Sequence, residues 1–198
     1  MLILPPADET VRIMSFDPGT DTLGLAVSDA NFAAGQVHAI HVETFKASKY
    51  VNLHDEYQLV TETHGDRQAR LRSHYDRAFT QLEHWQPHIV VSESPFMGMR
   101  AQAYAALVEC VDTLRWALAH YNPTMPLELI PPMSAKKVVG ASGRGKDKDD
   151  VQRCIASLIE QQRIVYSGML PFHTLDEHSI DAMTVGYAMA HFLKSEIG

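Results

Sequence analysis

Three acidic residues stand at places where carboxylates would harm a hydrophobic core. Asp17 ends a first apolar run, Glu93 ends a second one, and Asp181 lies near the C-terminus. An unpaired buried charge costs several kcal/mol, so these positions call for another explanation. Hard divalent cations take oxygen ligands, and two such ions can clamp the attacking and leaving oxygens of a phosphodiester. The three acids therefore indicate a metal-dependent nuclease.

A histidine adds to this group. His178 lies three residues before Asp181, so a helix would place both side chains on one face. A neutral imidazole can bind a metal ion, with some preference for Mn²⁺ over Mg²⁺. The same group can carry a proton near neutral pH, which predicts activity that rises with pH through the histidine titration. Both roles stay open for His178, and Asp17 is our candidate for bridging two ions.

These side chains need strands that end together and a helix that approaches them. Buried or alternating apolar runs predict strands over 11–17, 22–28, 37–45, 88–92 and 127–130. Apolar residues at helical spacing predict helices over 67–85, 100–121, 149–164 and 176–194. Short turns join the first three strands and suggest an antiparallel meander. The whole pattern predicts an α/β fold, with a mixed five-stranded sheet and helices on both faces.

Two further segments and one helix start are predicted. Residues 1–10 read as an N-terminal arm, and the polar, aperiodic segment 46–65 as a long loop. Thr174 and Glu177 have the spacing of a capping box that would begin the last helix.

Composition restricts the class of protein. The 198 residues are 45% hydrophobic and 21% charged, which fits one globular domain. No apolar stretch approaches the ~20 residues of a membrane span, and the N-terminus does not resemble a secretory signal. Cys110 and Cys154 are expected to be reduced thiols, and the cytoplasm is the expected compartment. The net charge of −7 argues against a strongly basic nucleic-acid binder, but local basic patches remain possible.

Four stretches resemble the motifs of one family, in the family's order. They are Phe16-Asp17-Pro-Gly-Thr20 with Gly24, then Val91-Ser-Glu93-Ser-Pro-Phe96-Met97, then Lys137-Val-Val-Gly140 with Lys146-Asp-Lys148-Asp-Asp-Val151, and His178-Ser-Ile-Asp181-Ala182. Together they are similar to the RuvC family of Holliday junction resolvases, within the ribonuclease H-like superfamily. The resemblance runs from the first strand to the last helix. It implies a single RuvC-like nuclease domain over residues 1–198.

The resemblance also implies an activity. It implies a homodimer that nicks two opposed strands of a four-way DNA junction, using two Mg²⁺ ions for which Mn²⁺ can substitute. The implied metal-site and catalytic residues are Asp17, Glu93, His178 and Asp181. Phe96 would stack on bases near the branch point. Lys148 would act on the scissile phosphate, with Lys146 as a competitor, because the spacing from the glycine turn exceeds the family's. Many family members have Asp where this chain has His178, and others have His.

Substrate contacts require local positive charge. One candidate patch comprises Lys136, Lys137, Arg144, Lys146 and Lys148. Arg100 follows Phe96 closely and could hold the DNA backbone beside a stacked base. The arginines at 67, 70, 72 and 77 are a second candidate, although a solvated helix face is the simpler interpretation. Phe96 could also belong to the core.

Other functions fit parts of the pattern. A nuclease of the same fold could process RNA or other branched DNA, because the acids do not define the substrate. Asp17-Pro-Gly-Thr20 also fits the phosphate loop of an actin-like ATP-binding module, but that fold needs two related domains. A catalytically inactive DNA-binding scaffold would not require all three acids.

Overall fold

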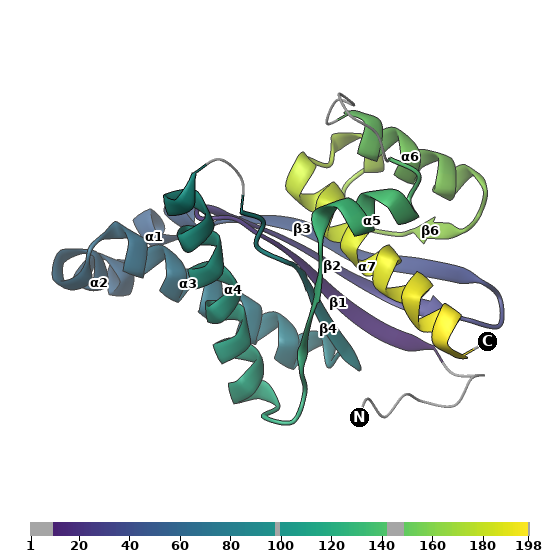
Figure 1. Ribbon diagram of the computed structural model, residues 1–198. Coiled ribbons are helices and arrows are strands. Elements are labelled where there is room, and N and C mark those ends of the chain that lie inside the picture. Colours follow the sequence, from purple (N-terminus) through teal and green to yellow (C-terminus); the bar gives the residue numbers. More distant parts are fainter. Residues whose placement is uncertain (1–9, 98–99, 142–148, 198) are drawn as a thin grey trace.

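A six-stranded sheet forms the centre of the molecule. The computed structural model describes residues 10–97, 100–141 and 149–197. Within these residues the strands follow the order β5-β4-β1-β2-β3-β6 across the sheet (Figure 1). They are β1 (Val11–Pro18), β2 (Thr22–Asn31), β3 (Gln36–Lys46), β4 (Ile89–Glu93), β5 (Leu127–Ile130) and β6 (Ile164–Tyr166).

The pairing of the strands decides which residues share an edge. β1, β2 and β3 form the predicted antiparallel meander. β4 lies parallel to β1, with Ser92 opposite Phe16, so both strands end at the same edge. β5 is parallel to β4, and β6 is parallel to β3. The ends of β1 and β4 therefore bring Asp17 and Glu93 to one edge of the sheet, which we call the acidic edge.

Helices cover both faces of the sheet, as predicted. They are α1 (Ala47–Leu53), α2 (Asp55–His64), α3 (Asp66–Trp85), α4 (Ala101–Tyr121), α5 (Pro132–Val138), α6 (Asp149–Glu160) and α7 (Glu177–Ile197), with a 3-10 turn, η1, at Phe172–Thr174. Figure 1 shows α3 and α4 on one face and α5, α6 and α7 on the other, with α1 and α2 beyond one end of the sheet.

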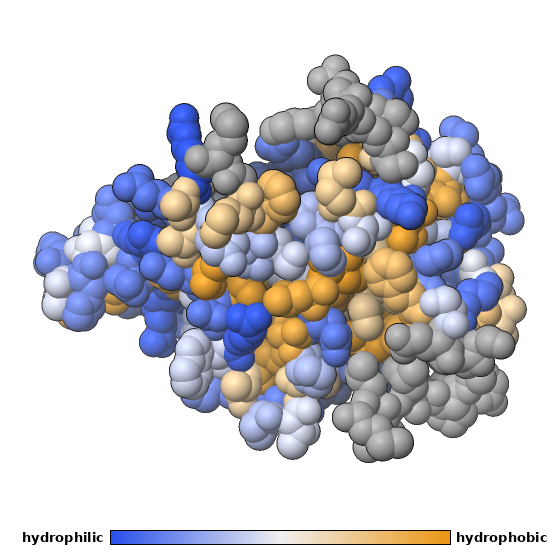
Figure 2. Space-filling model, viewed as in Figure 1, coloured by the Kyte–Doolittle hydropathy of each residue, from blue (hydrophilic) through white to orange (hydrophobic). Residues whose placement is uncertain are grey.

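Alternating side chains of the strands supply a core on each face. Met14 and Phe16 of β1 pack in one buried cluster with Leu114 of α4. Ile13, which points the other way, joins a second cluster with Ile180 of α7. In Figure 2 hydrophobic residues gather over the middle of the visible face, whereas the end formed by α1 and α2 is mostly hydrophilic.

The last helix lies very close to the sheet. Gly186 of α7 faces Ser15 of β1. A Cβ atom at position 186 would lie only 2.7 Å from Ser15 Oγ, so a larger residue would not fit there. Ser15 Oγ in turn donates a hydrogen bond of 2.8 Å to the carbonyl of Ala182. A small residue on the helix and a buried hydroxyl on β1 thus fix how deeply α7 sits.

The local structure differs from the predictions in three places. The segment 46–65 is not a long loop: it forms α1 and α2, which bury Val51 and Tyr57 in a small cluster with Ala69. The sheet has a sixth strand, β6, which is three residues long and pairs with β3. The helix α5, over 132–138, was not predicted at all.

The start of α7 also differs from the prediction. The hydroxyl of Thr174 donates to the carbonyl of Pro171, so it does not cap α7. Asp176 precedes the helix, and its Oδ1 atom accepts the backbone N–H of Ser179 at 2.9 Å. Asp176 is therefore the N-cap residue. No helix of the described residues is long and apolar enough to span a bilayer.

Candidate active site

The acidic edge gathers residues from three distant parts of the sequence. Asp17 ends β1, and Glu93 ends the neighbouring β4. The first turns of α7 carry His178 and Asp181 to the same edge, since His178 reaches Asp17 directly. Asp17, Glu93 and Asp181 thus converge on this edge, where the charges of Asp17 and Asp181 help to raise the pKa of Glu93.

His178 contacts β1 and β2 through its two ring nitrogens. Nδ1 lies 2.8 Å from Asp17 Oδ2, and Nε2 lies 2.9 Å from the Thr22 hydroxyl. The hydrogen bond to Asp17 raises the pKa of His178, against the effect of burial. Both nitrogens are engaged in this arrangement, which orients Asp17. Metal ligation and proton transfer by His178 stay predictions.

Gly24 explains how the helix comes so close. It lies opposite Asp17 in the β1–β2 ladder. A Cβ atom at this position would come within 2.2 Å of the His178 carbonyl oxygen and 3.1 Å of the Asp17 Cβ atom. Glycine is therefore required for the first turn of α7 to cross β2 and for His178 to reach Asp17.

Two of the carboxylates are held in an unfavourable electrostatic environment. Burial raises the pKa of Glu93 to about 8, and the charges of Asp17 and Asp181 add to this effect. Burial also raises the pKa of Asp181, although Lys136 opposes the shift. Carboxylates that are buried together without a compensating charge repel each other. The acidic edge therefore favours a bound cation.

Lys136 is a basic residue at the acidic edge. Its Nζ atom lies 3.8 Å from Asp181 Oδ2, and α5 positions it there. A hollow of about 430 Å³ opens beside the pair, between α5, α6 and the start of α7. Lys136 belonged to the predicted basic patch, but its contact with an acidic residue could not be predicted because α5 was missed.

The side chains fit a divalent metal ion in type and charge. Carboxylate oxygens are the donors that Mg²⁺ and Mn²⁺ prefer. Within residues 10–97, 100–141 and 149–197, however, no three His, Cys, Asp or Glu side chains are placed closely enough to hold one ion. These side chains would have to move closer together to hold one ion between them.

The predicted DNA contacts fall into two groups. Phe96 is 65% exposed, so it does not belong to the core. Arg100, at the start of α4, and Lys137, on α5, are exposed as well. Arg144, Lys146 and Lys148 lie outside the described residues.

The arginines of α3 are mostly engaged by acids. Arg67 pairs with Glu109 of α4, at 2.7 Å. Arg77 pairs with Glu43 of β3, and Arg72 pairs with Asp76 one turn along its own helix. These pairs agree with a structural role for the arginine cluster.

Comparison with known proteins places the fold. A scan against protein-family models and a search of curated proteins found no match. Among solved structures, RuvC of Thermus thermophilus in complex with a Holliday junction substrate has a TM-score of 0.70 and 18% identity, and the match covers 94% of this chain and 96% of that chain. The yeast mitochondrial Holliday junction resolvase Ydc2 has a TM-score of 0.65 and 13% identity, over 97% of this chain and 82% of that chain.

A viral nuclease shares the architecture less closely. The human cytomegalovirus terminase nuclease domain, soaked with Mn, has a TM-score of 0.51 and 14% identity, over 98% of this chain and 90% of that chain. The mixed sheet with helices on both faces agrees with these similarities. The chain thus has the ribonuclease H-like fold of RuvC and related Holliday junction resolvases.

Proposed function

We propose that this protein is a metal-dependent endonuclease that resolves four-way DNA junctions. The observation that carries the proposal is the meeting of Asp17, Glu93 and Asp181 at one edge of a RuvC-like sheet, with the pKa of Glu93 raised to about 8. A bound cation would favour the ionised form of Glu93 in this cluster. Two divalent cations would convert the cluster into a centre for phosphodiester hydrolysis.

In this proposal the chain supplies ligands and their orientation. Asp17, Glu93 and Asp181 would hold the ions, and Asp17 would be the central ligand, because β1 pairs with the strand of Glu93 and Asp17 contacts His178 of α7. Bound ions lower the pKa of water and offset charge on the phosphate. His178 keeps the Asp17 carboxylate oriented through the 2.8 Å contact. Lys136 offsets part of the charge of Asp181 before substrate arrives.

Exposed side chains near the acidic edge are the proposed contacts with the DNA substrate. Phe96 lies three residues after Glu93 and presents its ring to solvent, where it can stack on an unpaired base at the branch point. Arg100, at the start of α4, and Lys137, in the last turn of α5, are exposed and would contact phosphates. Lys146 and Lys148 keep their proposed roles at the scissile phosphate.

Symmetric cutting requires two active sites, so we propose a homodimer. Trp116 of α4 is 65% exposed and borders a hollow with Leu71, Tyr75 and His120. Exposed tryptophan of this kind is frequent at the centre of protein interfaces. We therefore assign the surface of α3 and α4 around Trp116 to the contact between two copies.

A substrate panel tests the proposal. The protein is incubated with end-labelled four-way junction, three-way fork and linear duplex, each with Mg²⁺, Mn²⁺ or EDTA. We expect paired, metal-dependent nicks confined to the four-way junction. Failure to cut any of the DNAs with either metal, over a range of pH, would overturn the proposal.

The same substrate panel tests whether the protein is a nuclease with broader substrate specificity. The terminase nuclease domain shows that this architecture is not restricted to junction resolvases. If the fork is cut as fast as the junction, the protein is a general nuclease for branched DNA. An RNA hairpin with a single-stranded end extends the comparison to RNA processing.

A further inference from the structure

A second groove opens beside the acidic edge, on the side of β3 and α1. It has a volume of about 540 Å³. Its lining includes Thr22, Lys46, Lys49, Tyr50, Leu53 and Asp176. We call it the α1 groove. It involves the segment that the sequence did not identify as helical.

The α1 groove carries unpaired positive charge. Lys46 and Lys49 are exposed, and neither has an ion-pair partner among the residues that the structure describes. Two acids also line the groove, and of these Glu43 is paired with an arginine, whereas Asp176 keeps its charge. Glu43 accepts a hydrogen bond of 2.9 Å from Arg77, and Asp176 accepts one of 2.5 Å from Thr44. The two lysines are therefore available to an anion.

Thr22 connects the lining of the groove to the acidic edge. Lys46 lies opposite Thr22 in the β2–β3 ladder, and the Thr22 hydroxyl contacts His178. Lys46 lies two strands from Asp17 and two residues along β3 from Thr44, which is level with Asp17 through Gly24. These offsets correspond to roughly 12 Å, which about three to four nucleotides would cover at about 3.4 Å of rise each.

Apolar and aromatic side chains line the same groove as the two lysines. Leu53 is 69% exposed, although α1 packs its other face on the protein. Tyr50 stacks on His54 with ring centroids 3.9 Å apart, which gives the groove a rigid aromatic wall. A wall of this kind suits sugars and bases, whereas the lysines suit phosphates.

From these contacts we propose that the α1 groove holds a DNA strand of the substrate next to the cleavage centre. Lys46 and Lys49 bind its phosphates, and Tyr50 and Leu53 contact its sugars or bases. This inference rests on the proposed nuclease function and adds a substrate path to it. The α1–α2 segment is then part of the binding surface for DNA.

The test measures binding of a fluorescent four-way junction as a function of salt, with Ca²⁺ or EDTA present. The double variant Lys46→Ala/Lys49→Ala should bind at least tenfold more weakly. The slope of log K against log salt should fall by about 1.8, since each phosphate contact contributes about 0.9. Lys46→Arg/Lys49→Arg should stay close to the wild type, because the charges are kept.

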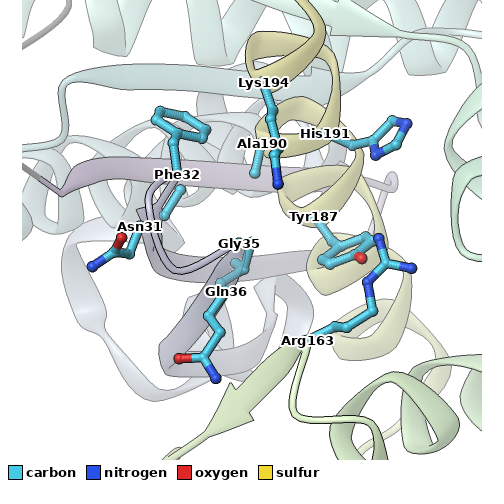
Figure 3. A pocket seen from close by; sticks show the side chains of 11 residues that line it. Asn31, Phe32, Gly35, Gln36, Arg163, Tyr187, Ala190, His191 and Lys194 are labelled. Carbon is cyan, nitrogen blue, oxygen red and sulfur yellow. The ribbon is translucent and has the colours of Figure 1, made fainter. Parts of the chain in front are cut away.

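Lys194 provides a matched control at the other end of α7. It lies about 24 Å from His178, at about 1.5 Å per residue of helix. Figure 3 shows it in a separate hollow with Arg163 and Tyr187. Lys194→Ala should leave the affinity and the salt slope unchanged. Thermal unfolding of every variant checks that exposed lysines have been replaced without loss of the fold.

The outcomes separate the two proposals. Unchanged affinity and slope in the double alanine variant, with wild-type cutting of the junction, would overturn the α1 groove and leave the nuclease proposal intact. Weakened binding in that variant, with no cutting of any substrate by the wild type, would support the groove and overturn the nuclease. A wild-type protein that binds no DNA would overturn both.

Discussion

The 2.8 Å contact between Nδ1 of His178 and Oδ2 of Asp17 joins the beginning of α7 to the end of β1. It leaves the other oxygen of Asp17 without a contact to His178. Glu93 and Asp181 approach the same place with raised pKa values. The charge of Asp17 is therefore central to the site, and its removal separates catalysis from binding.

We expect Asp17→Asn to abolish cutting of the junction. The amide keeps the shape of the side chain but is a poor ligand for Mg²⁺. Binding should be kept or improved, because one negative charge near phosphate disappears. Cleavage and equilibrium binding are measured side by side, with Asp112→Asn on the exposed surface of α4 as control. Asp17→Asn with normal cutting would contradict the proposed role.

The burial of His74 in α3 predicts that the stability of the protein depends on pH. It is 2% exposed, and burial lowers its pKa to about 4 from the ordinary 6.5. The folded protein then binds fewer protons than the unfolded chain between these pH values, so stability rises as the pH increases through this range and is fully present above 6.5. The difference corresponds to about 3 kcal/mol.

Urea unfolding between pH 4 and 7 measures this effect. The His74→Asn variant should lose most of the pH dependence that His74 causes, whereas His191→Asn, on an exposed histidine, should keep it. An equal slope in the His74 variant and the wild type would show that other groups control acid stability.

At the scale of single residues, the sequence identified the acidic residues as candidates for the site. Asp17 and Glu93 could be found because each follows an apolar run, and Asp181 and His178 because they share a helical face. Thr22 and Lys136 could not be found as their partners. Thr22 reaches His178 across 156 residues, and such contacts depend on how α7 crosses the sheet.

At the scale of elements, α7 and β2 must touch almost backbone to backbone for the site to form. We expect Gly24→Ala to push the first turn of α7 away from β2, because the added methyl group would meet the His178 carbonyl. The cost should be about 1–3 kcal/mol, as for overpacked cores. Urea unfolding measures the loss of stability.

The same variant should separate His178 from Asp17. The pKa of His178 in the metal-free protein, followed by NMR, should then fall toward the ordinary value, since its main cause is that hydrogen bond. A Gly24→Ala protein with unchanged stability and unchanged His178 resonances would contradict the close approach described here.

The five predicted strands and four predicted helices were confirmed with shifted ends, because their apolar periodicity is strong. The missed elements lack that signal. β6 has three residues and depends on pairing with β3. α1 and α2 are short, and tertiary contacts such as the 2.6 Å hydrogen bond from Tyr57 to Asp76 stabilise them.

At the scale of the whole molecule, the net charge of −7 does not prevent a local basic surface. Several acids of the described residues are used in structural pairs, such as Asp29 with Arg12 and Glu109 with Arg67. Lys46, Lys49 and Lys137 remain exposed around the acidic edge. The distribution of charge, rather than its sum, decides whether DNA binds.

The proposed dimer predicts the effect of one exposed side chain. Trp116→Ala should raise the dimer dissociation constant at least about tenfold, as the loss of an interface hot spot does. Analytical ultracentrifugation over a range of concentrations measures this constant. Met169→Ala, at a 93% exposed side chain, is the control. A Trp116→Ala protein that dimerises like the wild type would place the contact elsewhere.

The central claim is that Asp17, Glu93 and Asp181 form a metal centre, and calorimetric titration with Mn²⁺ tests it most directly. Wild type and Asp112→Asn should bind the ion equally, and Asp17→Asn should bind it at least tenfold more weakly. Equal binding by Asp17→Asn and the wild type, or no binding by the wild type, would contradict the claim.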